Sequence, residues 1–173
     1  EISMKQSLQI WLEAARPKTL PLALVSILTG SVLAYSAGRF SLTIAVMAFV
    51  TATLLQILSN LANDYGDAVQ GTDNDNRLGP QRAMQSGAVT AEQMKKAIIF
   101  NIILTAIAGL TLVFYALSSF ESIITFIGLG ILAIIAAIAY TMGSKPYGYV
   151  GLGDLSVFIF FGLLGVSGTY FLH

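Results

Sequence analysis

Five apolar runs, each close to the length of a membrane-spanning helix, constrain the fold of this chain more than any other feature. They are approximately Leu20–Ala37, Leu42–Leu61, Ala97–Leu117, Ile123–Met142 and Leu155–Leu172. A helix of about 20 mainly apolar residues crosses the hydrocarbon core of a bilayer. The runs also lack the alternation of apolar and polar residues that a membrane β-barrel requires. We therefore predict an all-α, polytopic transmembrane helical bundle with about five spans, which forms a single domain over residues 1–173.

Composition narrows the chemistry that such a bundle can perform. Charged residues are 10% of the chain, against about 25% in a soluble domain. Nine basic and nine acidic residues cancel, which excludes nucleic-acid binding through bulk positive charge. The chain has no cysteine, and His173 is its one histidine. Thiol catalysis and histidine triads are therefore excluded, and the chemistry must come from Asp, Asn, Lys, Arg and Tyr.

The positions of the basic residues predict the orientation in the bilayer. Eight of the nine basic residues lie before the first run, between the second and third runs, or between the fourth and fifth runs. These three segments lie on the same side of the membrane, and Arg39 alone lies on the other side. The positive-inside rule then places the N-terminus and two long connections, residues 62–96 and 140–154, in the cytoplasm. Long polar connections are where functional residues tend to lie.

A short amphipathic segment precedes the first run. Leu8, Trp11 and Leu12 are interspersed with Gln9 and Glu13. This pattern predicts an interfacial helix along the lipid headgroups, anchored by Trp11. A cleaved signal peptide is the alternative, but the apolar run that follows is too long for one.

A stripe of polar residues follows the second apolar run. Five polar side chains fall within an arc of about 100° if the segment is helical: Gln56, Asn60, Asn63, Asp64 and Asp67. Amide and carboxylate oxygens suit Mg²⁺, which typically takes one or two carboxylates together with a substrate phosphate. A solvated helix end is the alternative, but polar groups at membrane depth usually mark a functional site.

The two connections add further candidate residues. After the stripe, Asp73 adds a carboxylate, and Arg77 and Arg82 add guanidinium groups suited to phosphate oxygens. The second connection contains Tyr140, Lys145 and Asp154. Its tyrosines could be interfacial belt residues and Lys145 only a topology signal. We give this connection weight because it is predicted on the same face of the membrane as the stripe. Within the fifth run, glycines recur every three residues and predict close helix packing: Gly162, Gly165 and Gly168.

Three stretches together resemble the UbiA superfamily of intramembrane prenyltransferases. They are residues 16–21, 60–82 and 140–154. Residues 60–67 resemble its first aspartate-rich motif, and the set resembles the branch that prenylates 1,4-dihydroxy-2-naphthoate. Gly71 stands where the commonest family pattern has another aspartate, with Asp73 two residues further on. The family fold has nine helices and a second aspartate-rich motif, so only its N-terminal part is present here.

The resemblance implies Mg²⁺-dependent transfer of a polyprenyl group from polyprenyl diphosphate to 1,4-dihydroxy-2-naphthoate, with decarboxylation, in menaquinone biosynthesis. It implies a multi-pass protein of the bacterial cytoplasmic (inner) membrane. We expect Mg²⁺ to be held by Asn63, Asp64, Asp67 and Asp73. We expect the diphosphate to be contacted by Lys18, Arg77, Arg82 and Lys145. Tyr140 would face the allylic cation or the acceptor, while Asn60 and Asp154 would support the metal-binding carboxylates.

Other interpretations stay open at this point. Another aromatic acceptor, such as 4-hydroxybenzoate, is the alternative within the family. A transporter half is the main alternative from another class, although we find no internal repeat and the carboxylates gather at a helix end. A non-catalytic fragment that binds metal and diphosphate is a third, and a homo-oligomer is also open.

Overall fold

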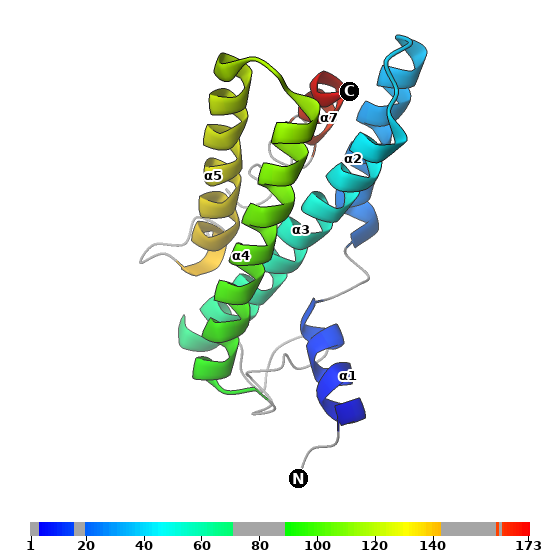
Figure 1. Ribbon diagram of the computed structural model, residues 1–173. Helices are drawn as coiled ribbons and strands as arrows, with labels where there is room; N and C mark the ends of the chain where they lie inside the picture. The colour runs from blue at the N-terminus through cyan, green and yellow to red at the C-terminus, as the bar shows by residue number, and fades with distance from the viewer. Residues whose placement is uncertain (1–3, 16–19, 71–88, 143–161, 163) are drawn as a thin grey trace.

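The computed structural model describes residues 4–15, 20–70, 89–142, 162 and 164–173. Within these ranges every regular element is a helix, so the predicted all-α class is confirmed. The helices are α1 (Met4–Ala15), α2 (Leu20–Ser36), α3 (Leu42–Gln70), α4 (Ala91–Ala116), α5 (Phe120–Met142) and α7 (Gly165–Leu172), as Figure 1 shows.

Three of these helices are long and apolar enough to cross a membrane, over Leu42–Gly66, Ala91–Ala116 and Phe120–Ile138. The apolar part of α2, Leu24–Ser36, is shorter, and the fifth predicted span falls partly outside the described residues. Large apolar side chains cover the outer faces, as Phe100, Ile107 and Phe114 do on α4. Such faces are stable against lipid, and the chain is therefore part of a multi-pass membrane protein.

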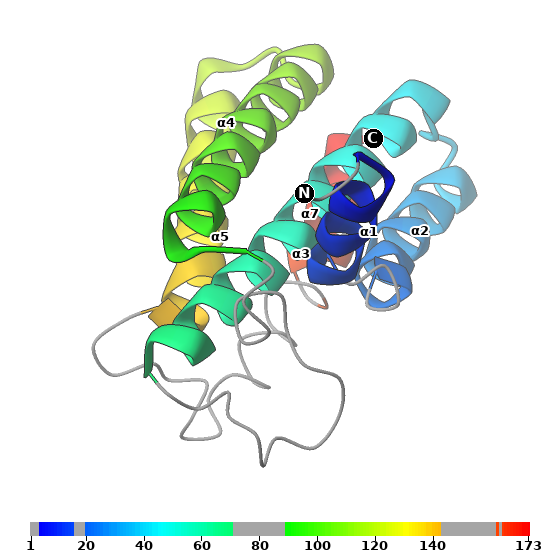
Figure 2. The ribbon, with the colours of Figure 1, turned by 90° about the horizontal axis from the view of Figure 1, so that it is seen from below.

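The bundle has two unlike ends. The short connections 37–41 and 117–119 lie at one end together with the C-terminus (Figure 1). Helix α1, the end of α3 and the start of α4 lie at the opposite end. Seen from below, α4 and α5 form a pair on one side, α2 lies on the other, and α3 runs between them (Figure 2). Helix α3 packs against all the other described helices, so it is the central helix.

Local signals fix two helix ends. At the end of α2, Gly38 adopts a φ of 77°, which glycine takes without steric cost. The N–H groups of Gly38 and Arg39 then donate to the carbonyls of Tyr35 and Ala34. At the start of α4, Thr90 and Gln93 form a reciprocal capping box.

Helices α2 and α7 approach each other closely at Gly30. A Cβ atom on Gly30 would lie 2.6 Å from the Val166 carbonyl oxygen and 2.8 Å from Thr169 Cβ. Two of the three glycines predicted to allow close packing, Gly165 and Gly168, lie on α7, the other helix of this pair. At Gly168 a Cβ atom would meet only Phe126 Cε1, at an ordinary 3.8 Å. The close approach therefore depends on Gly30 and not on Gly168.

Candidate active site

The polar stripe lies on one continuous helix. The predicted apolar run ends at Leu61, whereas helix α3 continues without a break to Gln70. Asn60, Asn63, Asp64 and Asp67 therefore share a helix face, as the sequence predicted, because residues three, four and seven positions apart line one side. The connection between α3 and α4 is therefore shorter than the predicted 62–96, since α3 ends at Gln70 and α4 begins at Ala91.

The side chains at the end of α3 are buried, which distinguishes it from a helix end exposed to solvent. The side chain of Asp64 is only 1% exposed, and that of Asn60 is 5% exposed. Leu58 and Ala62 are fully buried as well, so the helix end is enclosed on several sides. A carboxylate leaves water at a large cost in free energy unless it is paired or binds a metal. The burial of Asp64 therefore favours a functional site over a solvated helix end.

Asn60 connects the stripe to α1. Its Nδ2 donates to the carbonyl oxygen of Ala15 over 2.8 Å, and Gln56 Nε2 donates to its Oδ1 over 3.1 Å. Ala14 is buried beside Leu58 and Leu61, and Trp11 packs against the same cluster. Trp11 thus contacts the protein core, whereas Met4, Leu8 and Leu12 are large exposed apolar residues of α1.

The structure brings two further helix ends to the same place. Ile138, near the end of α5, packs against the cluster that contains Leu61, and Tyr140 follows two residues later. On α4, Lys95 Nζ lies 5.8 Å from the centre of the Tyr65 ring. Lys95 is a basic group beside the stripe that the sequence analysis did not assign to the site. Lys95 stands within the connection predicted over residues 62–96, and this position was the sequence signal that could have assigned it to the site.

Several predicted site residues lie wholly or partly outside the described part of the chain. Asp67 and Tyr140 lie in α3 and α5, but their side chains are outside the described set. The other predicted site residues lie outside the described residues altogether: Lys18, Asp73, Arg77, Arg82, Lys145 and Asp154. Across the described ranges, no group of three or more acidic, histidine or cysteine side chains could hold a metal ion. Asn63 and Asp64 supply amide and carboxylate oxygens, which fit Mg²⁺.

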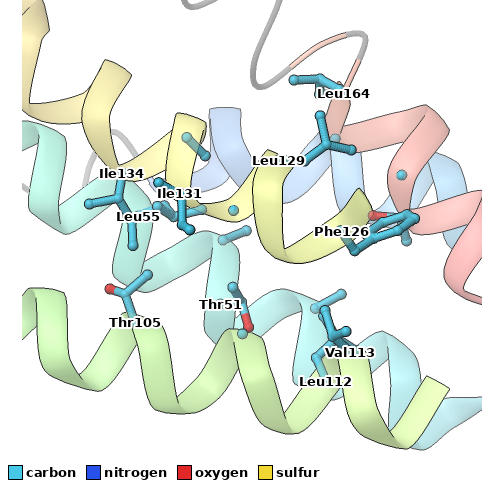
Figure 3. A pocket seen from close by; sticks show the side chains of 18 of the residues that line it. Thr51, Leu55, Thr105, Leu112, Val113, Phe126, Leu129, Ile131, Ile134 and Leu164 are labelled. Atoms are coloured by element: carbon cyan, nitrogen blue, oxygen red, sulfur yellow. The ribbon is translucent and has the colours of Figure 1, made fainter. Parts of the chain in front are cut away.

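An apolar cavity of about 400 Å³ lies among the helices of the bundle (Figure 3). Its wall comes from α2, α3, α4, α5 and α7, with Leu55, Phe126 and Ile134 among the larger side chains. Thr51 and Thr105 line it too, but their hydroxyls donate to carbonyls of their own helices. The lining reaches Ser59, which lies one helical turn before Asn63. The apolar volume thus reaches to within about one helical turn of Asn63 along α3.

Comparison with known proteins places this architecture in a family. The model of the UbiA prenyltransferase family matches residues 23–173. The chain belongs to the UbiA prenyltransferase family. The predicted resemblance is therefore confirmed, and the described helices are part of a UbiA fold.

Three relatives of this UbiA-family chain carry the printed name 1,4-dihydroxy-2-naphthoate octaprenyltransferase. The protein of Escherichia coli K12 is 53% identical over 95% of this chain and 54% of its own length. The Haemophilus influenzae protein is 51% identical over 98% of this chain and 56% of its own length. The Mycobacterium tuberculosis protein is 40% identical over 93% and 53% respectively. The chain thus spans about half the length of these relatives. No solved structure matches it.

Proposed function

We propose that the whole protein transfers a polyprenyl group to 1,4-dihydroxy-2-naphthoate, as the printed names of its relatives suggest. In this proposal the donor is polyprenyl diphosphate and the acceptor is decarboxylated. The observation that carries this proposal is the burial of Asp64 near the end of α3, the helix that lines an apolar cavity as far as Ser59, five residues earlier. An oxygen-rich stripe suits a metal-bound diphosphate, and an apolar volume next to it suits an isoprenoid tail.

The reaction breaks the bond between the allylic carbon and the diphosphate oxygen, and the diphosphate leaves with the bonding electrons. The electron-rich ring carbon of the acceptor then forms a carbon–carbon bond to the allylic carbon. Its carboxylate departs as CO₂, which restores the aromatic ring. Mg²⁺, when bound, would neutralise charge that develops on the leaving diphosphate.

We assign the residues of this chain to these steps as follows. Asn63, Asp64 and Asp67 hold Mg²⁺, with Asp73 as a further ligand. The diphosphate is contacted by Lys18, Arg77, Arg82 and Lys145. Tyr140 faces the allylic cation or the acceptor, and Asp154 supports the site from the second connection. The apolar cavity wall excludes the water that would quench the cation.

The test is a prenyl-transfer assay in membranes that carry the intact gene product. Dihydroxynaphthoate and a polyprenyl diphosphate are supplied with and without Mg²⁺. We expect a prenylated, decarboxylated quinol that forms only with Mg²⁺. Product from 4-hydroxybenzoate but not from dihydroxynaphthoate would show that the assigned acceptor is wrong. Absence of product with either acceptor would overturn the enzymatic assignment and favour transport or simple binding.

A further inference from the structure

We propose that Asn101 and Thr105 of α4 bind the 4-hydroxyl group of the aromatic acceptor and so hold its ring between the polar stripe and the apolar cavity. The inference rests on the proposed function, because that function supplies the acceptor. Neither residue belongs to the motifs that predicted the site.

The two side chains are buried within a helix that is long enough to span the membrane. Asn101 is 6% exposed and Thr105 is 3% exposed, and α4 runs from Ala91 to Ala116. The hydroxyl of Thr105 donates to two oxygens of Asn101, the backbone carbonyl over 2.8 Å and Oδ1 over 3.0 Å. Both bonds stay within α4, so they do not join one helix to another. Polar side chains at this depth usually mark a functional site.

Asn101 has hydrogen-bonding capacity that the described part of the chain does not use. Its Nδ2 donates to no residue in the described ranges. If the amide were turned over, Nδ2 would donate to Thr105 and Oδ1 would lack a donor instead. A buried polar group without a partner costs free energy. The pair is therefore better explained as a site for a polar group of a ligand than as packing between helices.

The contact between α3 and α4 places Asn101 level with Ser59. A Cβ atom on Gly109 would lie 3.9 Å from Thr51 Cγ2, so these two residues face each other. The two helices run in opposite directions (Figure 1). About two helical turns nearer the polar stripe on both helices, Asn101 therefore comes level with Ser59.

Asn101 thus lies between two residues of the cavity wall. Ser59 is level with it on α3, and Thr105, drawn in Figure 3, follows it by one turn on α4. Both of these residues line the cavity. Asn63 follows Ser59 by one helical turn, a rise of about 6 Å. A group bound at the pair therefore lies close to the carboxylate and amide oxygens proposed to hold the metal.

Of the two proposed substrates, only the acceptor carries uncharged polar groups. The diphosphate of the donor is anionic, and its isoprenoid tail offers no hydrogen-bonding group. In 1,4-dihydroxy-2-naphthoate, the 1-hydroxyl adjoins the carboxylate and donates to it within the molecule. The carbon that bears the carboxylate must face the allylic carbon beside the stripe, which turns the 4-hydroxyl toward the cavity. There the 4-hydroxyl donates to Thr105 Oγ1 and accepts from Asn101 Nδ2.

The test compares two ligands that differ by this hydroxyl, on the intact gene product in detergent micelles without oxygen. Titration calorimetry gives the Kd of 1,4-dihydroxy-2-naphthoate and of 1-hydroxy-2-naphthoate. We expect the unmodified protein to bind the dihydroxy compound about tenfold more tightly. Asn101→Leu and Thr105→Val should each reduce this ratio below about threefold and change the Kd of the monohydroxy compound less than about twofold. A ratio that is unchanged in either variant would overturn the inference.

A control and a stability measurement separate binding from packing. Thr51→Val is the matched control, because Thr51 also lines the cavity but its hydroxyl donates to the Met47 carbonyl of its own helix. It should leave the ratio unchanged. Asn101→Leu should not lower the Tm of the unliganded protein, since it removes a buried polar group and no described bond between helices. A lower Tm with an equal loss of affinity for both compounds would show a structural role and overturn the inference. If Asn101→Leu does not fold, Thr105→Val still decides.

This inference and the proposed function can fail separately. If the unmodified protein forms no prenylated product but shows the expected ratio, and both variants abolish it, the proposed function fails and the binding site stands. If product forms while the variants keep the ratio, the function stands and the binding site is overturned. Binding of neither compound by the unmodified protein would also overturn the binding site.

Discussion

The backbone N–H of Ser41 donates to Nδ1 of His173 over 3.0 Å. Because a backbone N–H can only donate, Nδ1 must accept, and the ring proton lies on Nε2. Nε2 therefore donates to the Ser31 hydroxyl, also over 3.0 Å, and the ring of Phe40 stacks on the imidazole. A neutral histidine thus joins the end of α7 to α2 and to the α2–α3 connection.

This arrangement makes stability depend on pH. Burial lowers the pKa of His173 below its ordinary value of 6.5, so the unfolded chain binds a proton more readily than the folded one. The stabilisation is complete above pH 6.5 and is lost as the pH falls below that value toward the lowered pKa. We expect the Tm of the chain in micelles to fall over that range. His173→Asn keeps an acceptor for Ser41 without titrating, so the drop should be smaller. Equal pH profiles would contradict this prediction.

Substitution of Gly30 should destabilise the protein. Gly30→Ala places a methyl group 2.6 Å from the Val166 carbonyl oxygen, and overpacking of this kind typically costs about 1–3 kcal/mol. Gly128→Ala is the matched control, because a Cβ atom there meets no atom within 4 Å. It should raise stability by about 0.5–1 kcal/mol, since alanine is the better helix former. Thermal unfolding of both variants measures whether the stability falls for Gly30→Ala and rises for Gly128→Ala.

Removal of either stripe carboxylate should abolish prenyl transfer by the intact gene product. We expect Asp64→Asn and Asp67→Ala to lose at least about 100-fold in turnover, because charge stabilisation by a bound metal contributes several kcal/mol. Glu92→Gln is the control, since Glu92 is an exposed carboxylate in the first turn of α4. It should keep its turnover and its Mg²⁺ dependence. Near-normal turnover in Asp67→Ala would show that the metal assignment is wrong.

A side chain added inside the cavity should discriminate between donors of different length. Gly109 lines the cavity, and a Cβ atom there meets only Thr51 Cγ2, at 3.9 Å. Gly109→Leu should lower turnover with a long polyprenyl diphosphate about tenfold, and with a ten-carbon donor much less. Gly128→Leu lies outside the cavity lining and should treat both donors alike. An equal loss with both donors in Gly109→Leu would argue against a tail in this cavity.

The absence of cysteine from these 173 residues allows a direct test of orientation. Arg39 and Glu92 are both exposed and lie at opposite ends of the bundle. We expect a membrane-impermeant maleimide to label Arg39→Cys in intact cells, and Glu92→Cys only after permeabilisation. Labelling of Glu92→Cys in intact cells would reverse the predicted orientation.

Features that depend on neighbours along the chain were predictable from the sequence. The length and apolarity of the runs determine helices in a membrane, because an isolated span must satisfy its own backbone hydrogen bonds. The helical repeat alone puts Asn60 and Asp64 on one face. The charged connection after the stripe, with its resemblance to one family, indicated the chemistry.

Contacts between distant segments were decided by the tertiary structure. The partner of Asn60 is a backbone carbonyl of α1, and a carbonyl carries no sequence signal. Between Gly30 and Gly168, the glycine that close packing of α2 and α7 requires is Gly30, since packing depends on which faces meet. His173, excluded from catalysis by composition, acquired its partners Ser31 and Ser41 only because α7 folds back onto α2. Local patterns determine which helices form, whereas the fit of one helix surface against another determines what each side chain contacts.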